Sequence, residues 1–240
     1  MKTVGIYIPT RGREGKQVTR RHLNDEIIVV HPEGEVHDAP CLVSPIEGMG
    51  PKRQWILENT KEDIILMLDD DLILYERDAE WEFEVYEQLN KLVRLDRLIE
   101  WIQSVDFIHG SISARQSNRG HIPDKSPGRA TCVLWYHRKC LDLGIDFTKI
   151  PAMSDFYTSL QMMELGYPNI VSHQFCYNQA SGTKGGCSIY RTKETMVEAA
   201  NILKARFPDV VTIVERETKG DGVFGGVRTD VRIDWRHAVK

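Results

Sequence analysis

Short apolar runs, each bounded by polar or turn-forming residues, recur along the N-terminal part of the chain. Residues 4–9 (VGIYIP) and 26–30 (EIIVV) are β-rich, and residues 64–68 (IILML) contain no polar position at all. An unbroken apolar run of this length predicts a strand that is buried on both faces, as in a parallel sheet. Residues 51–60 (PKRQWILENT) predict a helix, because proline suits a first helical turn. Strand, helix and strand in this order predict an α/β fold with a mixed, mostly parallel sheet flanked by helices.

The rest of the pattern predicts alternating helices and strands up to the C-terminus. Apolar residues recur at spacings of three, four and seven across residues 79–104, which indicates one long amphipathic helix. Further helices are expected at residues 154–165 and 193–206, and further strands near residues 105–109, 131–136, 170–173, 210–214 and 227–233. No segment has the composition of a linker, so we expect a single domain over residues 1–240.

Composition and charge narrow the class of protein. The 240 residues are 41% hydrophobic and 28% charged, which is typical of a globular enzyme, and neither value indicates a disordered chain or a coiled coil. No apolar run approaches the roughly 20 residues of a membrane span. The N-terminal MKTVGIYIPT lacks the apolar stretch of a signal peptide, so we expect a cytoplasmic protein without membrane contact. The five cysteines never form C-x-x-C, which favours reduced thiols over a zinc site.

The strongest chemical signal is the acidic triplet Asp69, Asp70 and Asp71, which lies between two apolar runs in LMLDDDLIL. Adjacent carboxylates at the end of a buried strand need a cation or strong hydrogen-bond donors nearby. In an extended chain Asp69 and Asp71 would share one face and Asp70 would point away. Two such carboxylates suit Mg²⁺ or Mn²⁺ together with nucleotide phosphates. The alternative is an acidic turn between two strands.

Cationic residues follow the first strand and begin the first predicted helix. Thr10, Arg11 and Arg13 stand at the end of a strand, where the planar fork of arginine suits phosphate. Lys52 and Arg53 follow two glycines at a helix start, where backbone donors and the helix dipole favour an anion. A plain surface turn is the alternative for the first group.

Three later features carry further candidate chemistry. Asp155 begins a predicted helix, where a simple N-cap is the commonest role of an aspartate. His173 follows a strand, where a lone histidine is more often structural. The segment 182–186 (GTKGG) predicts a loop, which either closes over a ligand or is a plain surface loop. Lys184 lies in this segment and Arg191 lies near it.

A local basic stretch runs from residue 110 to residue 139. It contains a single acid, Asp124, and six cations, namely Arg115, Arg119, Lys125, Arg129, Arg138 and Lys139. The whole chain has a formal net charge of −4, so a polyanion would have to bind such a local patch. A solvated loop whose charges are balanced in three dimensions is the alternative.

The order of these motifs resembles the GT-A glycosyltransferases and their D-x-D motif: a strand ending in P-T-R, a helix bearing Lys and Arg, an apolar strand and then D-D-D. The resemblance implies that residues Pro9 to Arg13 form the nucleotide wall and that Lys52 or Arg53 contacts the nucleotide. It implies that Asp69 or Asp70 lies on the ribose side and that Asp71 binds Mn²⁺ or Mg²⁺, with Asp69 and His173 as further ligands. It also implies that Asp155 is the general base, although the family usually shows two acids there and this chain has Ser154.

Over nearly its full length the chain further resembles phage glycosyltransferases associated with TET/JBP-type base oxygenases. IYIPTRGR, KRQWILEN, LDDDL, DFYTSLQMMELGYPN, SGTKGGCSIYRT and DVRIDW carry this resemblance. It implies transfer of a sugar from a UDP-sugar to hydroxymethylated pyrimidines in phage DNA, in the host cytoplasm. Residues 1–109 would then form the half that binds the nucleotide sugar and residues 110–240 the half that binds the acceptor.

The acceptor contacts expected in that second half are Arg115, Arg119, Lys184 and Arg191. Three other functions remain open: glycosyl transfer to a small molecule or glycan, metal-dependent nucleotidyl transfer, and DNA binding without catalysis.

Overall fold

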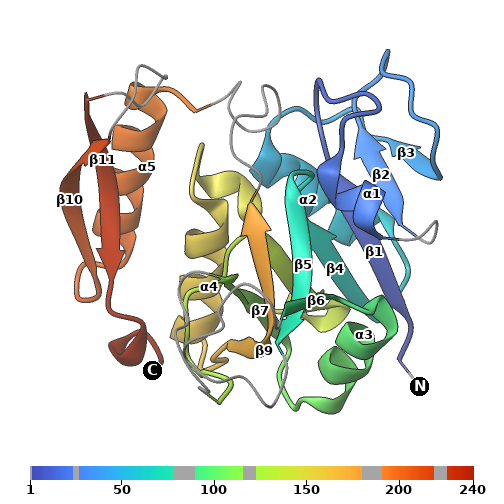
Figure 1. Ribbon diagram of the computed structural model, residues 1–240. Coiled ribbons are helices and arrows are strands. Elements are labelled where there is room, and N and C mark those ends of the chain that lie inside the picture. Colours follow the sequence, from blue (N-terminus) through green and yellow to red (C-terminus); the bar gives the residue numbers. More distant parts are fainter. Residues whose placement is uncertain (1, 24–26, 78–89, 116–122, 180–190, 219–225) are drawn as a thin grey trace.

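The computed structural model describes residues 2–23, 27–77, 90–115, 123–179, 191–218 and 226–240, and its helices and strands are arranged in layers (Figure 1). In chain order the main elements are β1 (Val4–Pro9), α1 (Val18–His22), β2 (Ile28–His31), β3 (Cys41–Val43), α2 (Met49–Asn59), β4 (Ile64–Leu68), β5 (Leu72–Arg77), β6 (Asn90–Leu92), α3 (Leu95–Ser104), β7 (His109–Ala114), β8 (Val133–His137), α4 (Ser154–Glu164), β9 (Ile170–Gln179), α5 (Lys193–Arg206), β10 (Val211–Thr218) and β11 (Gly226–Ile233). No helix in the described ranges is long and apolar enough to cross a membrane.

A central nine-stranded sheet has the order β3-β2-β1-β4-β8-β7-β9-β5-β6. Strands β3, β2, β1 and β4 pair in parallel, and β7 pairs in parallel with β9. Strands β8 and β5 are antiparallel to their neighbours on both sides, so all other strands of this sheet point the same way. The expected mixed, mostly parallel sheet is confirmed.

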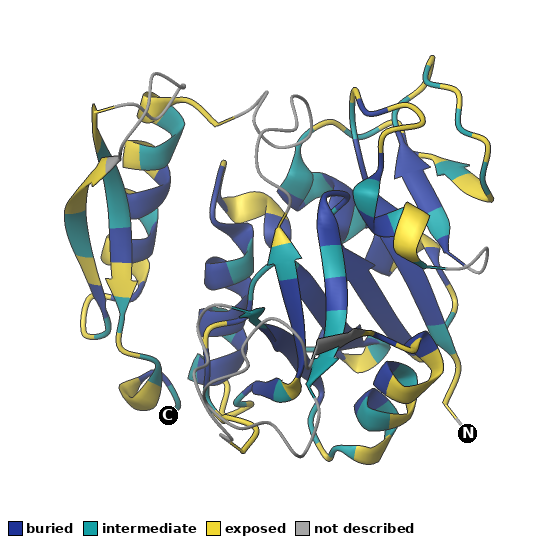
Figure 2. Cartoon of the chain, viewed as in Figure 1, coloured by how far each residue is buried: buried dark blue, intermediate teal, exposed yellow. Residues whose placement is uncertain are grey.

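The unbroken apolar run of β4 is buried on both faces of the sheet, as its sequence predicts. Ile64, Leu66 and Leu68 pack into one apolar cluster, and Ile65 and Met67 pack into another on the opposite face. Successive side chains of a strand alternate between faces, so one strand contributes to two cores. Helix α3 covers the first cluster and α2 covers the second, and Figure 2 shows the buried strands between outer helices.

The helix predicted over residues 79–104 is wrong over residues 90–94. The described helix α3 begins at Leu95, whereas residues 90–92 form strand β6, which pairs with the end of β5. Residues 78–89 lie outside the described ranges. From Leu95 onward the apolar spacing is that of a helix, and Leu95, Leu98 and Ile102 face the core.

The strand expected near residues 105–109 begins only at His109, and β7 continues through Gly110, Ser111 and Ser113, which the sequence pattern did not assign to a strand. Glycine fits this strand because a Cβ on Gly110 would lie 2.5 Å from the carbonyl oxygen of Ile170 and 2.6 Å from the Trp135 ring. The two neighbouring strands therefore pack directly against the backbone of β7. The sequence pattern did not predict α1 or β3, which are short, and it left β5 as an unassigned apolar run.

The C-terminal elements form a second, smaller layer. Helix α5 and the antiparallel hairpin β10–β11 stand beside α4 in Figure 1. Their apolar side chains, among them Leu203, Phe207, Val211 and Val231, share one buried cluster with Tyr157, Leu160 and Met163 of α4. The helix expected at residues 193–206 is confirmed, and the two late strands are longer than expected.

Helices α2 and α4 make a close approach at Gly50. A Cβ at this position would lie 2.4 Å from the carbonyl oxygen of Phe147 and 3.3 Å from Cβ of Ser154. Alanine normally stabilises a helix by about 1 kcal/mol relative to glycine. Here we expect Gly50→Ala to lower the free energy of unfolding by about 1–3 kcal/mol, because the added carbon overpacks the contact. Chemical denaturation measures the change, and a gain in stability would show that the two helices are not in close contact.

Candidate functional site

The acidic triplet occupies a turn between β4 and β5, at the edge of the sheet where the parallel strands end. Thr19 of α1 holds this turn in place and is fully buried. Its hydroxyl donates to the carbonyl oxygen of Asp69 (2.6 Å) and accepts from the backbone N–H of Leu72 (2.7 Å). The backbone N–H of Thr19 also donates to the carbonyl oxygen of Asp70 (3.3 Å). The side chains of the triplet therefore project from a fixed backbone.

Asp70 is the innermost carboxylate of the triplet. Its two oxygens accept hydrogen bonds from the Thr10 hydroxyl and from the Arg13 guanidinium, and all three residues are buried. Burial raises the pKa of Asp70 to about 6, and the neighbouring charges of Asp69 and Asp71 raise it too, whereas Thr10 and Arg13 lower it. These contacts tie the end of β1 to the end of β4.

Asp71 has longer contacts than Asp70. The side-chain amide of Gln179, at the end of β9, donates to its two oxygens at 3.3 and 3.2 Å. Nη1 of Arg13 lies 3.4 Å from Oδ2 of the same carboxylate. Asp71 is thus placed at the sheet edge by two partners that hold it loosely.

Asp69 faces a different partner. Its Oδ1 accepts from Nη2 of Arg53 at 2.8 Å, and Nη1 of the same guanidinium donates to the Ser154 hydroxyl at 3.5 Å. The expectation that Asp69 and Asp71 share one face is wrong, because Asp70 and Asp71 share Arg13 whereas Asp69 turns to Arg53. Strand β4 ends at Leu68, so the alternation of an extended chain does not continue through the triplet.

The other residues predicted around the nucleotide lie at the end of β1 and the start of α2. Nζ of Lys52 donates to the carbonyl oxygen of Thr10 at 2.7 Å, and Lys52 is buried. Pro9 is the last residue of β1 and is buried too. Arg11 is partly exposed and forms an ion pair with Glu47 at 3.2 Å. The structure therefore brings Pro9, Thr10, Arg13, Lys52 and Arg53 together around the triplet.

Asp155 lies in the first turn of α4 and is not an N-cap. The N-cap is Met153, which has a left-handed backbone (φ 58°) and makes no side-chain cap, so that alternative for Asp155 is wrong. The carboxylate accepts from the backbone N–H of Phe156 at 3.0 Å. Burial raises the pKa of Asp155, and the positive charges of Arg53 and Arg191 lower it. A raised pKa is typical of a carboxylate that accepts a proton near neutral pH.

Arg53 therefore lies between the triplet and the helix that carries Asp155. Its guanidinium contacts Asp69 and Ser154, and its charge acts on Asp155. Arg191, which precedes α5, acts on the same carboxylate. Residues far apart in the sequence thus meet at one centre.

His173 lies away from this centre. It sits in β9, six positions before Gln179, which is roughly 20 Å along an extended strand. Its Nδ1 contacts the carbonyl oxygen of Pro123 at 3.2 Å, and its own carbonyl oxygen accepts from Arg77 at the far end of β5. The expectation that His173 and Asp71 bind one metal ion is wrong for this reason.

The residues of the predicted basic stretch have different structural roles. Arg138 donates to the carbonyl oxygens of Leu57 and Glu62, at 2.9 and 3.0 Å, and so fixes the end of α2. The guanidinium of Arg115 lies 4.8 Å from the centre of the Tyr75 ring. Arg119, Lys184 and the segment 182–186 lie outside the described residues. The stretch is therefore not one continuous patch over its described part.

The oxygen donors of the triplet fit a divalent cation of the Mg²⁺ or Mn²⁺ type. Among the described residues no group of three or more His, Cys, Asp and Glu side chains forms a metal cage. Mg²⁺ commonly uses one or two carboxylates together with substrate phosphates and water, so a cage is not required. Among the described side-chain contacts of the three carboxylates, those of Asp71 are the longest.

Thr19 and Gln179 both shape the site, but neither belongs to a motif that the sequence shows. Thr19 lies in a five-residue helix without an apolar period, so no sequence signal marks it. Gln179 ends β9, which pairs with β5, and only the sheet order shows that it reaches the triplet.

Three solved structures with a similar fold are complexes with a nucleotide or a nucleotide sugar. A mannosyltransferase from Pyrobaculum calidifontis in complex with GDP-Man and Mn²⁺ has 14% identity and a TM-score of 0.55, covering 93% of this chain and 67% of its own. TarS from S. aureus with UDP-GlcNAc has 14% identity and a TM-score of 0.52, covering 85% of this chain and 67% of its own. Glucosyl-3-phosphoglycerate synthase from Mycobacterium tuberculosis with Mg²⁺ and UDP has 12% identity and a TM-score of 0.52, covering 98% and 91%.

At this level of identity the three structures establish the fold, which is that of the GT-A glycosyltransferases. A comparison with curated proteins finds no match. Residues 4–186, from β1 to a point before α5, match the TET-associated glycosyltransferases. This match includes the triplet, Arg53 and Asp155, and it covers most of the chain. The chain therefore belongs to the TET-associated glycosyltransferase family.

Proposed function

We propose that this glycosyltransferase transfers a sugar from a UDP-sugar to the hydroxyl of a hydroxymethylated pyrimidine in DNA, with Mn²⁺ or Mg²⁺ as cofactor. The observation that carries the proposal is the position of Arg53, which contacts Asp69 and acts on Asp155. It joins the carboxylate triplet to the candidate base. The donor half, residues 1–109, and the acceptor half, residues 110–240, would meet at this guanidinium.

On the donor side, Pro9 to Arg13 and Lys52 would form the wall of the nucleotide site. Two of the three similar structures hold a uridine nucleotide and two hold a divalent ion, which supports a UDP-sugar and a metal. Asp71 would hold the ion and Asp69 would lie near it. Asp70 would keep its buried contacts and would not bind the ion. A bound divalent cation would supply charge neutralisation of the diphosphate leaving group.

On the acceptor side, Asp155 would accept the proton of the acceptor hydroxyl. The oxygen then forms a bond to the anomeric carbon of the sugar, and the bond from that carbon to the diphosphate oxygen breaks. The nucleoside diphosphate leaves with the bonding electron pair. Association of the family with TET-type oxygenases, which make hydroxymethylated pyrimidines, supports a primary hydroxyl of such a base as the acceptor. A base inside a duplex would have to be flipped out.

The pH dependence of transfer tests the role of Asp155. A base must be deprotonated, so kcat/KM should fall toward low pH through a pKa that burial holds above that of an ordinary aspartate. The charge of Arg191 lowers this pKa, and Arg191 is exposed. We expect Arg191→Gln to shift the acid limb of the pH–rate profile to higher pH. An unchanged or downward-shifted limb would show that the limb does not report Asp155.

The function itself is tested by mass spectrometry of hydroxymethylated DNA after incubation with the protein, Mn²⁺ and a panel of sugar nucleotides. We expect a mass increase of one sugar per modified base, with release of intact nucleoside diphosphate. Pyrophosphate release would indicate nucleotidyl transfer. Sugar transfer to small molecules or glycans, with none to DNA, would restrict the proposal to the glycosyltransferase reaction. Loss of transfer on chelation of divalent ions is expected in the same assay.

A further inference from the structure

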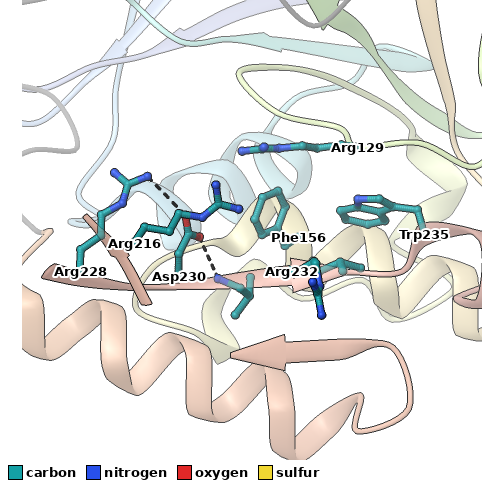
Figure 3. A pocket seen from close by; sticks show the side chains of 9 residues that line it. Arg129, Phe156, Arg216, Arg228, Asp230, Arg232 and Trp235 are labelled. Atoms are coloured by element: carbon teal, nitrogen blue, oxygen red, sulfur yellow. Dashed lines mark hydrogen bonds and ion pairs between the residues drawn. The ribbon is translucent and has the colours of Figure 1, made fainter. Parts of the chain in front are cut away.

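A pocket distinct from the donor site lies between the core and the C-terminal hairpin (Figure 3). Its lining residues are Arg129, Phe156, Arg216, Arg228, Asp230, Val231, Arg232, Ile233 and Trp235. We call it the arginine pocket. Its volume is about 230 Å³, which is below the roughly 300–1,000 Å³ of pockets that enclose a whole small molecule. It is therefore of a size to hold one group of a larger ligand.

The arginine pocket has an excess of positive charge. Arg216 and Arg228 stand directly opposite each other in the β10–β11 ladder. One oxygen of Asp230 lies 3.2 Å from Nε of Arg216 and 3.3 Å from Nη2 of Arg228, and so orients both guanidiniums. Like charges at opposed positions destabilise a hairpin, and one carboxylate neutralises only one of them. An anion in the pocket would relieve this repulsion.

Further donors of the pocket are unused among the residues that the structure describes. Nε of Arg228 is buried and has no hydrogen-bond partner in the described ranges. Arg129 and Arg232 are exposed and form no ion pair with any described carboxylate. Arginine presents a planar fork of N–H donors that matches the oxygens of a phosphate group.

The arginine pocket adjoins the candidate base. Phe156, which lines it, directly follows Asp155 in α4. The guanidinium of Arg129 lies 5.2 Å from the centre of the Phe156 ring, and the Trp235 ring meets Phe156 edge to face at 5.7 Å, as Figure 3 shows. Phe156 is buried, whereas Trp235 is partly exposed. A partly exposed aromatic ring beside cationic groups is typical of sites that bind a nucleic acid strand through its phosphates and stacked bases.

We propose that the arginine pocket binds a backbone phosphate of the DNA acceptor and thereby positions the modified base beside Asp155. This inference rests on the proposed function and assigns the acceptor contact to Arg129 and the C-terminal hairpin. The hairpin lies beyond residues 4–186, so the surface joins the family core to elements outside the matched region. It also differs from the continuous stretch at residues 110–139 that the sequence predicted.

The test is the binding of a labelled, hydroxymethylated oligonucleotide to the full chain at several salt concentrations. The double variant Arg129→Gln/Arg232→Gln should bind about tenfold more weakly. The slope of log K against log salt should become shallower by about 0.7–0.9 for each phosphate that the variant no longer neutralises. Arg129→Lys/Arg232→Lys should recover part of the affinity because it restores the charge. The matched control is Arg94→Gln, since Arg94 is 71% exposed on the N-terminal side of α3 and its partner among the described residues is the exposed Asp96.

Kinetics separates this inference from the function on which it rests. The ratio of KM for the oligonucleotide to KM for the free hydroxymethylated nucleoside, which has no phosphate, should rise about tenfold in the glutamine variant. If the wild type glycosylates the oligonucleotide and this ratio and the salt slope do not change, the pocket inference is overturned and the function stands. If the wild type transfers no sugar to hydroxymethylated DNA, both are overturned. Circular dichroism confirms that the compared variants are folded.

Discussion

Asp155→Asn is expected to lower the rate of sugar transfer by about 10²–10⁴-fold, the range that a positioned general base contributes. Asparagine keeps the size of the side chain and its acceptor oxygen for the Phe156 N–H, but it does not accept the hydroxyl proton. The substitution also removes a carboxylate whose pKa burial raises. The fold should therefore tolerate it, and the loss should appear in kcat rather than in the binding of the nucleotide sugar.

Steady-state kinetics with hydroxymethylated DNA measures this loss, and isothermal titration calorimetry measures binding of the donor. Asp142→Asn is the matched control, because it makes the same chemical change at an exposed position. We expect activity close to that of the wild type for the control. A kcat for Asp155→Asn within tenfold of the wild type would rule out Asp155 as the base. Loss of donor binding together with kcat would instead place its role on the donor side.

The parts of the fold that the sequence predicted are those fixed by local pattern. The unbroken apolar run of β4 and the helix α5 lie where their patterns placed them. Strand β7 was harder to predict, because Gly110 is explained by Trp135 and Ile170, which are distant in the sequence. The short β6 was misread as helix, since its role depends on pairing with β5. Local periodicity does not contain this information.

In the candidate site, too, some residues are predicted by a local pattern and others depend on the tertiary structure. A triplet of carboxylates after a buried strand, and Arg13 after another, are local signals, and they lead to residues that do meet. The orientation of each carboxylate depends on Thr19, Arg53 and the end of β4, so the side-chain alternation of an extended strand does not predict it. The arginine pocket combines Arg129 with residues much later in the chain, as the sheet and hairpin geometry brings them together.

Asp71→Ala is expected to lower donor turnover by at least about 10²–10³-fold while the fold is retained, because it removes the carboxylate proposed to hold the cation beside the diphosphate. The contacts of Asp71 with Gln179 and Arg13 are 3.2 to 3.4 Å long, so their loss should cost little stability. Asp70→Ala makes the informative comparison. It removes the carboxylate that accepts hydrogen bonds from two buried donors, Thr10 and Arg13. We therefore expect the free energy of unfolding to fall by about 1.5–3 kcal/mol.

The two variants separate a binding role from a structural one. Calorimetry of UDP binding with and without Mn²⁺ should show a metal-dependent gain in affinity for the wild type, and this gain should be absent in Asp71→Ala. Thermal denaturation should show a clearly lower Tm for Asp70→Ala only. Full activity of Asp71→Ala, or an undiminished effect of Mn²⁺ on its UDP affinity, would contradict the metal role of Asp71. Because Asp70 and Asp71 are adjacent and share Arg13, opposite outcomes at these two positions would show that the turn after β4 assigns one carboxylate to the fold and the next to the ligand.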